Sequence, residues 1–275
     1  MPAATVSRDV ALVLERVEAE AWRDWYAAAA AEDRAALGIR THEVEGALAL
    51  SVDADESLLS NRTLGVGLAA PATDGLVDAL LAHYAGHAAG FAINLCPFAE
   101  PAGLERALAA RGFGTFFHHL KWVRGAEPPH EAPSELRVEV VAAGRSAAWA
   151  RLSARIRDST PAHAAWAARV VGRARWTHYW ALDGDEPVAV GALFVHDGAA
   201  WLGMAATLES HRRRGAQSAL FAHRVRDALA QGARWLCTET APDWPELGGQ
   251  SLRNAARAGF HPAYARPSWI FPLSR

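Results

Sequence analysis

Hydrophobic and polar positions alternate most clearly between Trp201 and Gly232. The apolar run 201–207 has the length and composition of a buried strand, and a basic turn follows at 211–217. After the turn, apolar side chains recur about every 3.6 positions, the period of a helix that packs one face on a core. The polar side chains that fall largely on its other face are Gln217, Arg224, Arg226 and Asp227. The stretch therefore predicts a strand, a basic glycine-containing turn and an amphipathic helix.

The rest of the C-terminal half continues this alternation of strands and helices. Turn residues at 183–186 and 196–198 predict that the strands around them form an antiparallel meander. Thr160 and Pro161 have the residue types of a helix cap and a first helical turn. The predicted strands are 136–140, 177–182, 187–195, 199–207 and 235–240, followed by strands through Tyr264 and 269–271, and the further helices are 147–157, 162–173 and 251–258.

The N-terminal half carries similar patterns. A helix is expected at 8–31, with an inner side formed by Leu12, Val13, Val17 and Trp22 or Trp25. Further strands are predicted at 46–52, 63–68 and 91–96, and further helices at 73–83 and 104–111. Residues 125–134 are rich in proline and polar side chains and lack periodicity, as expected of a stiff connector.

The two sides of this connector repeat a plan of strand, helix and strand. The helix in each repeat ends in a Gly-Phe pair, Gly112-Phe113 in the first and Gly259-Phe260 in the second. A glycine in that position suits a left-handed helix cap, and the phenylalanine begins the next strand. The shared order favours a duplication over chance. The predicted domains are an N-terminal domain at 1–125, a linker at 126–134 and a C-terminal domain at 135–275.

The basic turn has the physical features of an anion site. The first amides of a helix lack intrahelical acceptors and carry the positive end of the helix dipole. Three arginines at 212–214 add charge and bidentate donors, and Gly215 lets the backbone approach an anion closely. A phosphate fits such a position, although a solvated basic helix cap would have the same residues.

The corresponding turn of the N-terminal half lacks these features. Residues 69–75 include no arginine or lysine, and Thr73 or Asp74 would cap the helix amides with a side-chain oxygen. An aspartate there also repels phosphate. We therefore expect that the N-terminal half has lost any cofactor site and serves packing or substrate shaping.

The sequence Arg212-Arg213-Arg214-Gly215-Ala216-Gln217 resembles the acyl-CoA pyrophosphate loop of the GCN5-related N-acetyltransferases (GNAT superfamily), whose pattern is Arg/Gln-x-x-Gly-x-Gly/Ala. Gln217 departs from this pattern because Gly or Ala is usual there. The order of elements from Leu136 to Leu273 resembles the same family. The resemblance implies an α/β (α+β) fold of two tandem acyl-CoA N-acyltransferase-like domains, each a mixed, mostly antiparallel sheet flanked by helices. The N-terminal domain would be a degenerate copy.

The resemblance also implies an activity, namely transfer of an acetyl group from acetyl-CoA to the amine of a small-molecule acceptor by direct attack in a ternary complex. Backbone amides at 204–208 would hold the acyl carbonyl. The residues expected to bind acetyl-CoA are Ala206, Thr207, Leu208, Arg212, Arg213, Arg214, Gly215, Ala216, Gln217, Ser218, Ser251 and Asn254. A noncatalytic acyl-CoA-binding or regulatory protein on the same fold is the alternative.

Two residues are candidates for proton transfer. Glu239, near the end of an apolar strand, is the candidate base, directly or through water, and its alternative role is structural. Family members often carry a tyrosine at the position of Ala255, so Tyr264 on the next strand becomes the candidate acid, with core packing as its alternative. The loop carboxylates that could instead bind a cationic acceptor are Glu209, Asp243 and Glu246.

Charge, cysteine content and histidine spacing argue against several other classes of function. The chain of 275 residues has a formal net charge of -2, and no second basic stripe accompanies 212–214, which argues against a nucleic-acid partner. Cys96 and Cys237 lie in apolar runs and are expected to be core thiols. Neighbouring His118 and His119 would point to opposite faces of a strand, so no metal site is predicted.

The expected setting of the protein follows from the same composition. The chain shows neither a secretory signal pattern nor an apolar run long enough to span a bilayer, so we expect a cytoplasmic protein without a membrane partner. A tandem pair can satisfy internally the contacts that single-domain relatives make by dimerising. A monomer is therefore expected, with a homodimer as the alternative.

Overall fold

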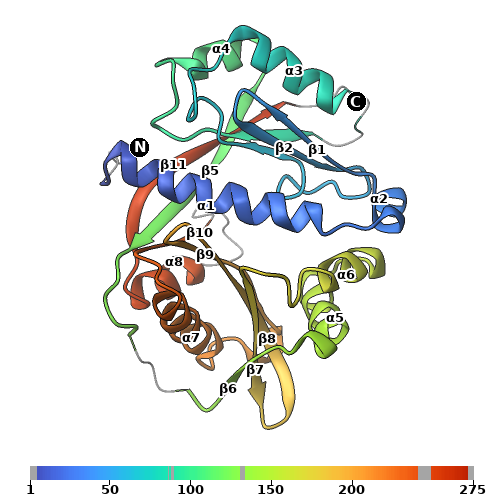
Figure 1. The fold of residues 1–275 in the computed structure, drawn as a ribbon, viewed down its shortest axis with the longest axis vertical. Coiled ribbons are helices and arrows are strands. Elements are labelled where there is room, and N and C mark those ends of the chain that lie inside the picture. The colour runs from blue at the N-terminus through green and yellow to red at the C-terminus, as the bar shows by residue number, and fades with distance from the viewer. Residues whose placement is uncertain (1–4, 86, 88–89, 131–133, 241–248, 272–275) are drawn as a thin grey trace. The chain divides into compact units, whose positions relative to one another are not determined.

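The computed structural model describes residues 5–85, 87, 90–130, 134–240 and 249–271, which form two compact units (Figure 1). Unit 1 consists of the described residues up to Lys121 together with 262–271, and unit 2 consists of 122–240 and 249–261 as far as they are described. The division is therefore not consecutive in sequence, because the last strand of the chain belongs to unit 1. The predicted domain ranges 1–125 and 135–275 stay a prediction.

Unit 1 begins with the helix α1 (Arg8–Ala27). The hydroxyl of Ser7 caps this helix by accepting a hydrogen bond from the amide of Val10 at 3.4 Å. α1 ends at Ala27, and a second, short helix, α2 (Ala31–Leu37), follows it. This second helix was not predicted from the sequence. The expectation of one helix over 8–31 was therefore wrong at its end.

The buried face of α1 differs in part from the predicted one. Val17 and Trp25 are buried as expected. The predicted residues that are only partly buried are Leu12, Val13 and Trp22. Glu15 and Glu18 are buried instead, and their charges require partners from other elements of unit 1.

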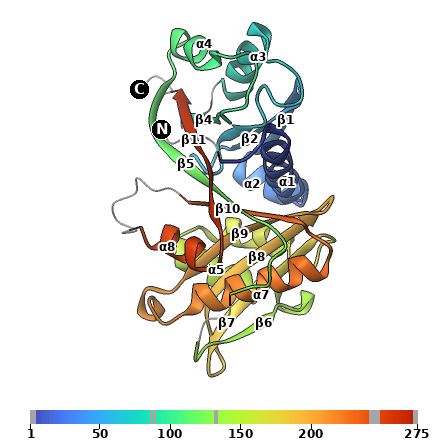
Figure 2. The same ribbon diagram turned by 90° about the vertical axis from the view of Figure 1, so that its left-hand side faces the viewer.

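The sheet of unit 1 has the strand order β1-β2-β3-β4-β11-β5. Its elements are β1 (Ile39–Val44), β2 (Ala47–Val52), β3 (Arg62–Leu64), α3 (Asp74–Tyr84), β4 (Phe91–Asn94), α4 (Leu104–Ala110), β5 (Gly114–Arg124) and β11 (His261–Phe271). β1 and β2 form an antiparallel hairpin, β3 is parallel to β4, and β11 is antiparallel to β4. Figures 1 and 2 show α3 and α4 on one side of this sheet and α1 on the other.

An ionic cluster inside unit 1 holds the last strand. Glu18 accepts hydrogen bonds from Lys121 Nζ at 2.6 Å and from Arg266 at 2.6 and 3.1 Å. Glu15 accepts from Arg266 at 2.9 Å and from the Tyr264 hydroxyl at 2.9 Å. Removal of one member would leave an uncompensated buried charge, so the cluster ties β11 strongly to α1 and β5.

Unit 2 follows the predicted order of elements closely. Its elements are β6 (Arg137–Val140), α5 (Ser146–Arg157), α6 (Pro161–Ala168), β7 (Trp176–Asp183), β8 (Glu186–His196), β9 (Ala199–Thr207), α7 (Ala216–Ala230), β10 (Trp235–Thr240) and α8 (Gln250–Arg257). The strand order β10-β9-β8-β7-β6 and the antiparallel pairing of β7, β8 and β9 confirm the predicted meander. Helices α7 and α8 cover one face of the sheet, and α5 and α6 cover the other (Figure 1).

The predicted helix ends are confirmed in both repeats. Gly112 and Gly259 adopt φ values of +88° and +81°, which only glycine adopts without strain. The amides of the following Phe113 and Phe260 each donate to the carbonyl five residues earlier at 3.1 Å. The two helices thus end in the same hydrogen-bonded motif, which supports the predicted duplication.

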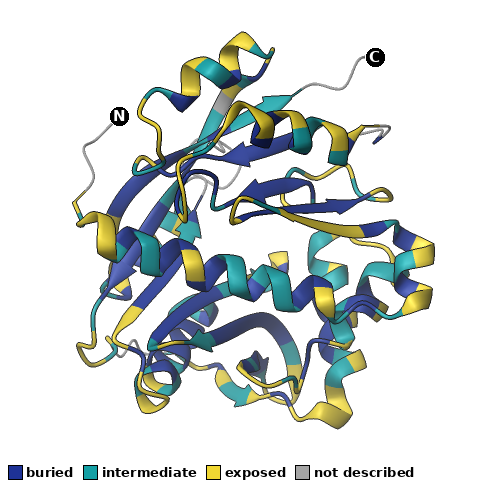
Figure 3. Ribbon diagram, turned by 45° about the horizontal axis from the view of Figure 1, so that its top comes forward, coloured by how far each residue is buried: buried dark blue, intermediate teal, exposed yellow. Residues whose placement is uncertain are grey.

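The strands are mostly buried, and the outer faces of the helices are exposed (Figure 3). Cys96 and Cys237 are buried thiols, as predicted. In the described part of the chain, no helix is both long and apolar enough to cross a bilayer.

Candidate functional site

Strand β9 carries a bulge near its end. Val190 pairs with Ala206 and Ala192 pairs with Gly203, so two residues of β9 lie opposite one residue of β8. Met204 in this bulge has a φ of +52°, which is uncommon for a residue with a side chain. A bulge redirects the local backbone groups away from the regular ladder. The bulge, at 204–205, lies within the segment 204–208 where the sequence predicts the amides that hold an acyl carbonyl.

Arg224 of α7 lies fully buried beneath this bulge, which corrects its predicted place on the polar face of the helix. Its guanidinium donates to the carbonyls of Gly203 and Ala192 at 3.3 and 3.5 Å, on the two strands that flank the bulge. Burial lowers its pKa to about 10, so the group stays charged at neutral pH. A side chain on Gly191 would meet the guanidinium carbon at 3.4 Å. A small residue on a neighbouring strand, such as Gly191, was the signal in the sequence that could have indicated room for a large buried side chain.

The strand beside β9 carries the predicted base. β10 runs parallel to β9, with Trp235–Cys237 paired to Ala199–Trp201. The Thr238 hydroxyl donates to the Leu202 carbonyl at 2.8 Å, and the described register ends before Glu239. Glu239 is half-buried and lies at the carboxyl end of β10. The carboxyl ends of β9 and β10 therefore lie at the same sheet edge and bring the bulge and this carboxylate to one side.

Helix α7 begins without a side-chain cap. Its N-cap residue is Gly215, with a φ of +84° and no side chain to accept a hydrogen bond. Among the described residues, none accepts a hydrogen bond from the amides of Ala216, Gln217 or Ser218. The Gln217 side chain donates to the Thr207 hydroxyl at 2.9 Å, which ties the helix to the end of β9. The predicted residues of this corner are thus brought together with their amides open.

The three arginines before α7 are not equivalent. Arg214 donates to Asp183 at 2.6 Å, and this guanidinium holds the pKa of the Asp183 carboxyl below its usual range. Arg212 lies 3.6 Å from Glu209 in an exposed ion pair. Arg213 is exposed, has a φ of +65° and forms no ion pair within the described residues. Asp183, at the tip of the β7–β8 hairpin, positions the turn and was not found from the sequence.

This corner fits a diphosphate. The open amides and the left-handed Gly215 form a backbone cradle at the positive end of the α7 dipole. The exposed guanidinium of Arg213 adds a bidentate donor for a phosphate. Asp183 and Glu209 offset part of the positive charge through Arg214 and Arg212. The geometry therefore favours one bound diphosphate over a broad polyanion surface.

The remaining predicted cofactor contacts lie on α8. Ser251 is exposed, and the Asn254 side-chain oxygen accepts hydrogen bonds from Gln250 at 3.0 Å and from Arg257 at 2.6 Å. A role of either residue toward a cofactor stays a prediction. The alternative acceptor-binding carboxylates Asp243 and Glu246 lie outside the described residues.

The environment of Tyr264 fits the alternative given for it, core packing. This tyrosine belongs to unit 1, whereas β9, α7 and Glu239 belong to unit 2. It is 2% exposed, and its hydroxyl donates to the buried Glu15. Burial and the adjacent carboxylate raise its pKa well above the ordinary value. A hydroxyl enclosed in this way has no access to a substrate, and its partner Glu15 gave no signal in the sequence.

The neighbouring histidines of β5 have different surroundings, and His118 lines a pocket whereas His119 does not. His119 is buried beside Asn94 and Ser268, with both contacts at 3.3 Å. Within the described residues, no group of histidine, cysteine and carboxylate side chains is arranged to hold a metal ion.

Known proteins resemble this chain in structure rather than in sequence. No known protein-family profile and no curated protein sequence matches the chain. A GCN5-related N-acetyltransferase from Kribbella flavida has a TM-score of 0.63 at 18% identity, over 86% of this chain and 90% of that chain. One from Sphaerobacter thermophilus has a TM-score of 0.60 at 14% identity, over 83% and 81%. A tandem GNAT protein from the clavulanic acid biosynthesis pathway has a TM-score of 0.55 at 15% identity, over 86% and 79%.

These similarities confirm the predicted fold. The chain has the fold of the GCN5-related N-acetyltransferases in its tandem form, with mixed, mostly antiparallel sheets flanked by helices.

Proposed function

We propose that the protein is an acyl-CoA-dependent N-acyltransferase that moves an acetyl group to the amine of a small-molecule acceptor in a ternary complex. The open N-terminus of α7 beside the basic turn carries this proposal, since it combines free amides, a left-handed glycine and an exposed arginine. Acetyl-CoA supplies the acyl group as a thioester. The amides of Ala216, Gln217 and Ser218 and the side chains of Arg212 and Arg213 would bind its diphosphate.

The residues at the sheet edge suit the transfer step. The bulge at Met204 supplies backbone amides for the acyl carbonyl, and the buried charge of Arg224 fixes the carbonyls on either side of that bulge. Glu239 would accept the proton of the attacking amine, directly or through water. With Tyr264 enclosed in unit 1 and Ala255 unable to donate, water would protonate the departing thiolate.

Isothermal calorimetry with acetyl-CoA tests the cofactor assignment. The double variant Arg212→Gln/Arg213→Gln should lose at least about tenfold in affinity, since each charge-assisted phosphate contact contributes about 1 kcal/mol or more. The matched control is Arg151→Gln/Arg155→Gln, two exposed arginines of α5 outside the turn. Equal affinity of the two double variants, or no heat with the unmodified protein, would refute the assignment.

A screen of amines for CoA release then tests the activity. Release that requires both acetyl-CoA and one class of amine supports the transferase. Tight acetyl-CoA binding without release across the amine classes would favour the noncatalytic acyl-CoA-binding alternative.

A further inference from the structure

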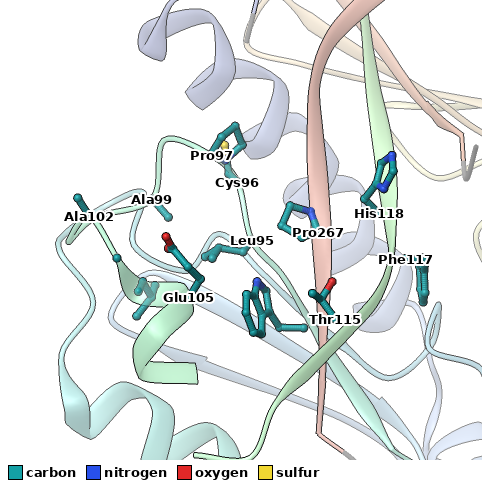
Figure 4. Close-up of a pocket in the computed structure, with 13 residues that line it drawn as sticks. Leu95, Cys96, Pro97, Ala99, Ala102, Glu105, Thr115, Phe117, His118 and Pro267 are labelled. Carbon is teal, nitrogen blue, oxygen red and sulfur yellow. The ribbon is translucent and has the colours of Figure 1, made fainter. Parts of the chain in front are cut away.

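Unit 1 contains a cavity of about 700 Å³ that the proposed acyl transfer does not use (Figure 4). It lies between the segment after β4, the first turn of α4 and the strands β5 and β11. Its volume falls within the range of about 300 to 1,000 Å³ that is typical of small-molecule sites. Its walls are mainly apolar, and the larger apolar side chains are Leu95, Leu104 and Trp269.

The cavity is formed by backbone that is held in place. Leu95 and Leu104 belong to the hydrophobic core of unit 1, and Trp269 packs against that core. The Leu95 amide donates to the Pro267 carbonyl at 3.0 Å, and the Glu100 amide donates to the Gly67 carbonyl at 2.8 Å. The rim segment is thus fixed at both ends. A ligand would meet a preformed site and would order little chain on binding.

The charge around the cavity selects the kind of ligand. Glu105 is the lining carboxylate, and it forms no ion pair among the described residues. The imidazole of His118 also lines the cavity. No lysine or arginine lines the cavity in the part of the chain that the structure describes. A carboxylate near one aromatic wall, the Trp269 ring, attracts an ammonium group through charge and through cation–π contact, and it repels phosphates and carboxylates.

The cavity is suited to binding rather than to covalent chemistry. Its one lining thiol, among the described residues, is Cys96. Burial raises the pKa of this thiol to about 12, so it remains protonated and is a poor nucleophile at neutral pH.

We propose that this cavity binds a small organic ammonium ion whose body is aromatic or branched aliphatic. The carboxylate of Glu105 pairs with the ammonium group, and the apolar body packs against Trp269 and Leu104. This proposal does not rest on the proposed acyl transfer, because every residue it uses belongs to unit 1.

Ligand-observed ¹⁹F NMR on the full chain tests this site with three matched probes. They are 4-fluorophenethylamine, 4-fluorophenethyl alcohol and 3-(4-fluorophenyl)propionate, which share a ring and differ in charge. We expect a Kd of about 1 mM for the amine, as is usual for a fragment of this size, and binding at least about fivefold weaker for the propionate. Equal affinity of the amine and the propionate would overturn the proposal, as would no binding of the amine.

Three variants locate the site. Glu105→Gln should weaken the amine about threefold and leave the alcohol unchanged, because an exposed charge pair contributes less than about 1 kcal/mol. Glu56→Gln, an exposed carboxylate of unit 1 outside the cavity, should change neither. Thr115→Trp should weaken all three probes at least about tenfold, since Thr115 is an exposed wall residue and an indole there fills the cavity.

The filling variant also separates this site from an acceptor site in unit 2. Amine binding that survives Thr115→Trp would overturn the proposal and assign the amine to another site. If Thr115→Trp does not fold by circular dichroism, Ala102→Trp on the exposed rim replaces it with the same expected loss.

Discussion

Helices α7 and α3 occupy the same place in the strand-helix-strand order of their units, and they begin in opposite ways. Gly215 starts α7 with no side-chain cap, and arginines precede it. Thr73 starts α3, and its hydroxyl accepts a hydrogen bond from the Leu76 amide at 3.2 Å. Glu45 accepts from the same Thr73 hydroxyl at 2.6 Å, and Asp74 lies in the first turn. The prediction that a side-chain oxygen caps this helix in the N-terminal half is thereby confirmed for Thr73.

The strand ends beside these helices differ as well. In unit 1 the segments after β3 and β4 are joined, because Glu100 donates to Gly67 and accepts from Ala72, both at 2.8 Å. A side chain on Gly67 would clash with the Glu100 carbonyl oxygen, so this contact depends on glycine. In unit 2, β9 ends in the bulge at Met204 instead.

The same order of elements is therefore not sufficient to make a cofactor site. A helix N-terminus attracts an anion only while its amides are open and the surrounding charge is positive. Unit 1 satisfies the Leu76 amide with the Thr73 hydroxyl. Glu45 and Asp74 place two carboxylates beside it. Arg111 pairs with Asp74 at 3.0 Å and offsets one of these charges. The order of elements is repeated in both units, but we expect an anion to bind only in unit 2.

The largest expected effect concerns Glu239. The corresponding strand of unit 1, β4, ends at Asn94 and is followed by Leu95 and Cys96, without a carboxylate, so the proposed base is specific to unit 2. Glu239→Gln should lower kcat about a hundredfold and leave acetyl-CoA affinity nearly unchanged, because removal of a general base slows only proton transfer. Steady-state kinetics with the amine found by screening measures this.

The exposed Glu186, at the start of β8, offers the control for this experiment. Glu186→Gln removes the same charge from unit 2 and should leave kcat unchanged. An unaltered kcat and pH profile in Glu239→Gln would assign the base to another group.

A carboxylate in the first turn of α7 should convert this helix into a closed one like α3. Ser218→Asp places an acceptor beside the open amides and repels the diphosphate. We expect a loss of roughly 2 kcal/mol in acetyl-CoA binding, or about thirtyfold, measured by calorimetry. Gln231→Asp adds the same charge at the other end of α7 and should have little effect. Similar losses in both variants would mean that net charge, rather than the helix N-terminus, governs binding.

Local patterns in the sequence predicted most of unit 2. The meander, α7 and the left-handed Gly259 follow from apolar period, turn residues and backbone preference, which act over a few positions. The open amides of Ala216, Gln217 and Ser218 were predicted in the same way, because they depend on Gly215 and its immediate neighbours.

Long-range partners could not be read from the sequence. The burial of Glu15 and Glu18 depends on Arg266, about 250 positions away along the chain. The enclosure of Tyr264 follows from the same cluster, because β11 joins unit 1. The burial of Arg224 likewise depends on space left by Gly191 on another strand, β8.

Buried histidines extend the comparison of the two units to pH. His119 of unit 1 has hydrogen-bond partners, whereas neither ring nitrogen of His178 in unit 2 has one, and its ring packs between Trp149 and Trp176. Burial lowers the pKa of each to about 3, from an ordinary value of 6.5. Unfolding therefore takes up protons below pH 6.5, and stability falls as the pH drops from about 6.5 towards about 3.

His178→Phe should remove one part of this acid sensitivity. An aromatic ring can occupy the same apolar space, and the free energy of unfolding should then fall less steeply by about 1.4 kcal/mol per pH unit below pH 6.5. Urea unfolding between pH 5 and 7 measures this. His261→Phe, at an exposed histidine of the same unit, should keep the original slope. Equal slopes in both variants would show that His178 accepts protons in the folded state.

The smallest expected effect concerns the cap that closes α3. Thr73→Ala removes the hydroxyl that accepts from Leu76 and should lower the free energy of unfolding by about 1 kcal/mol. It should not create a second acetyl-CoA site, because Glu45 and Asp74 keep the helix start negative. Ser7→Ala, which removes the cap of α1, is the matched control for stability, and calorimetric stoichiometry should stay at one acetyl-CoA per chain in both variants. A second equivalent bound by Thr73→Ala would mean that a single hydroxyl, rather than charge and the joined strand ends, separates the two units.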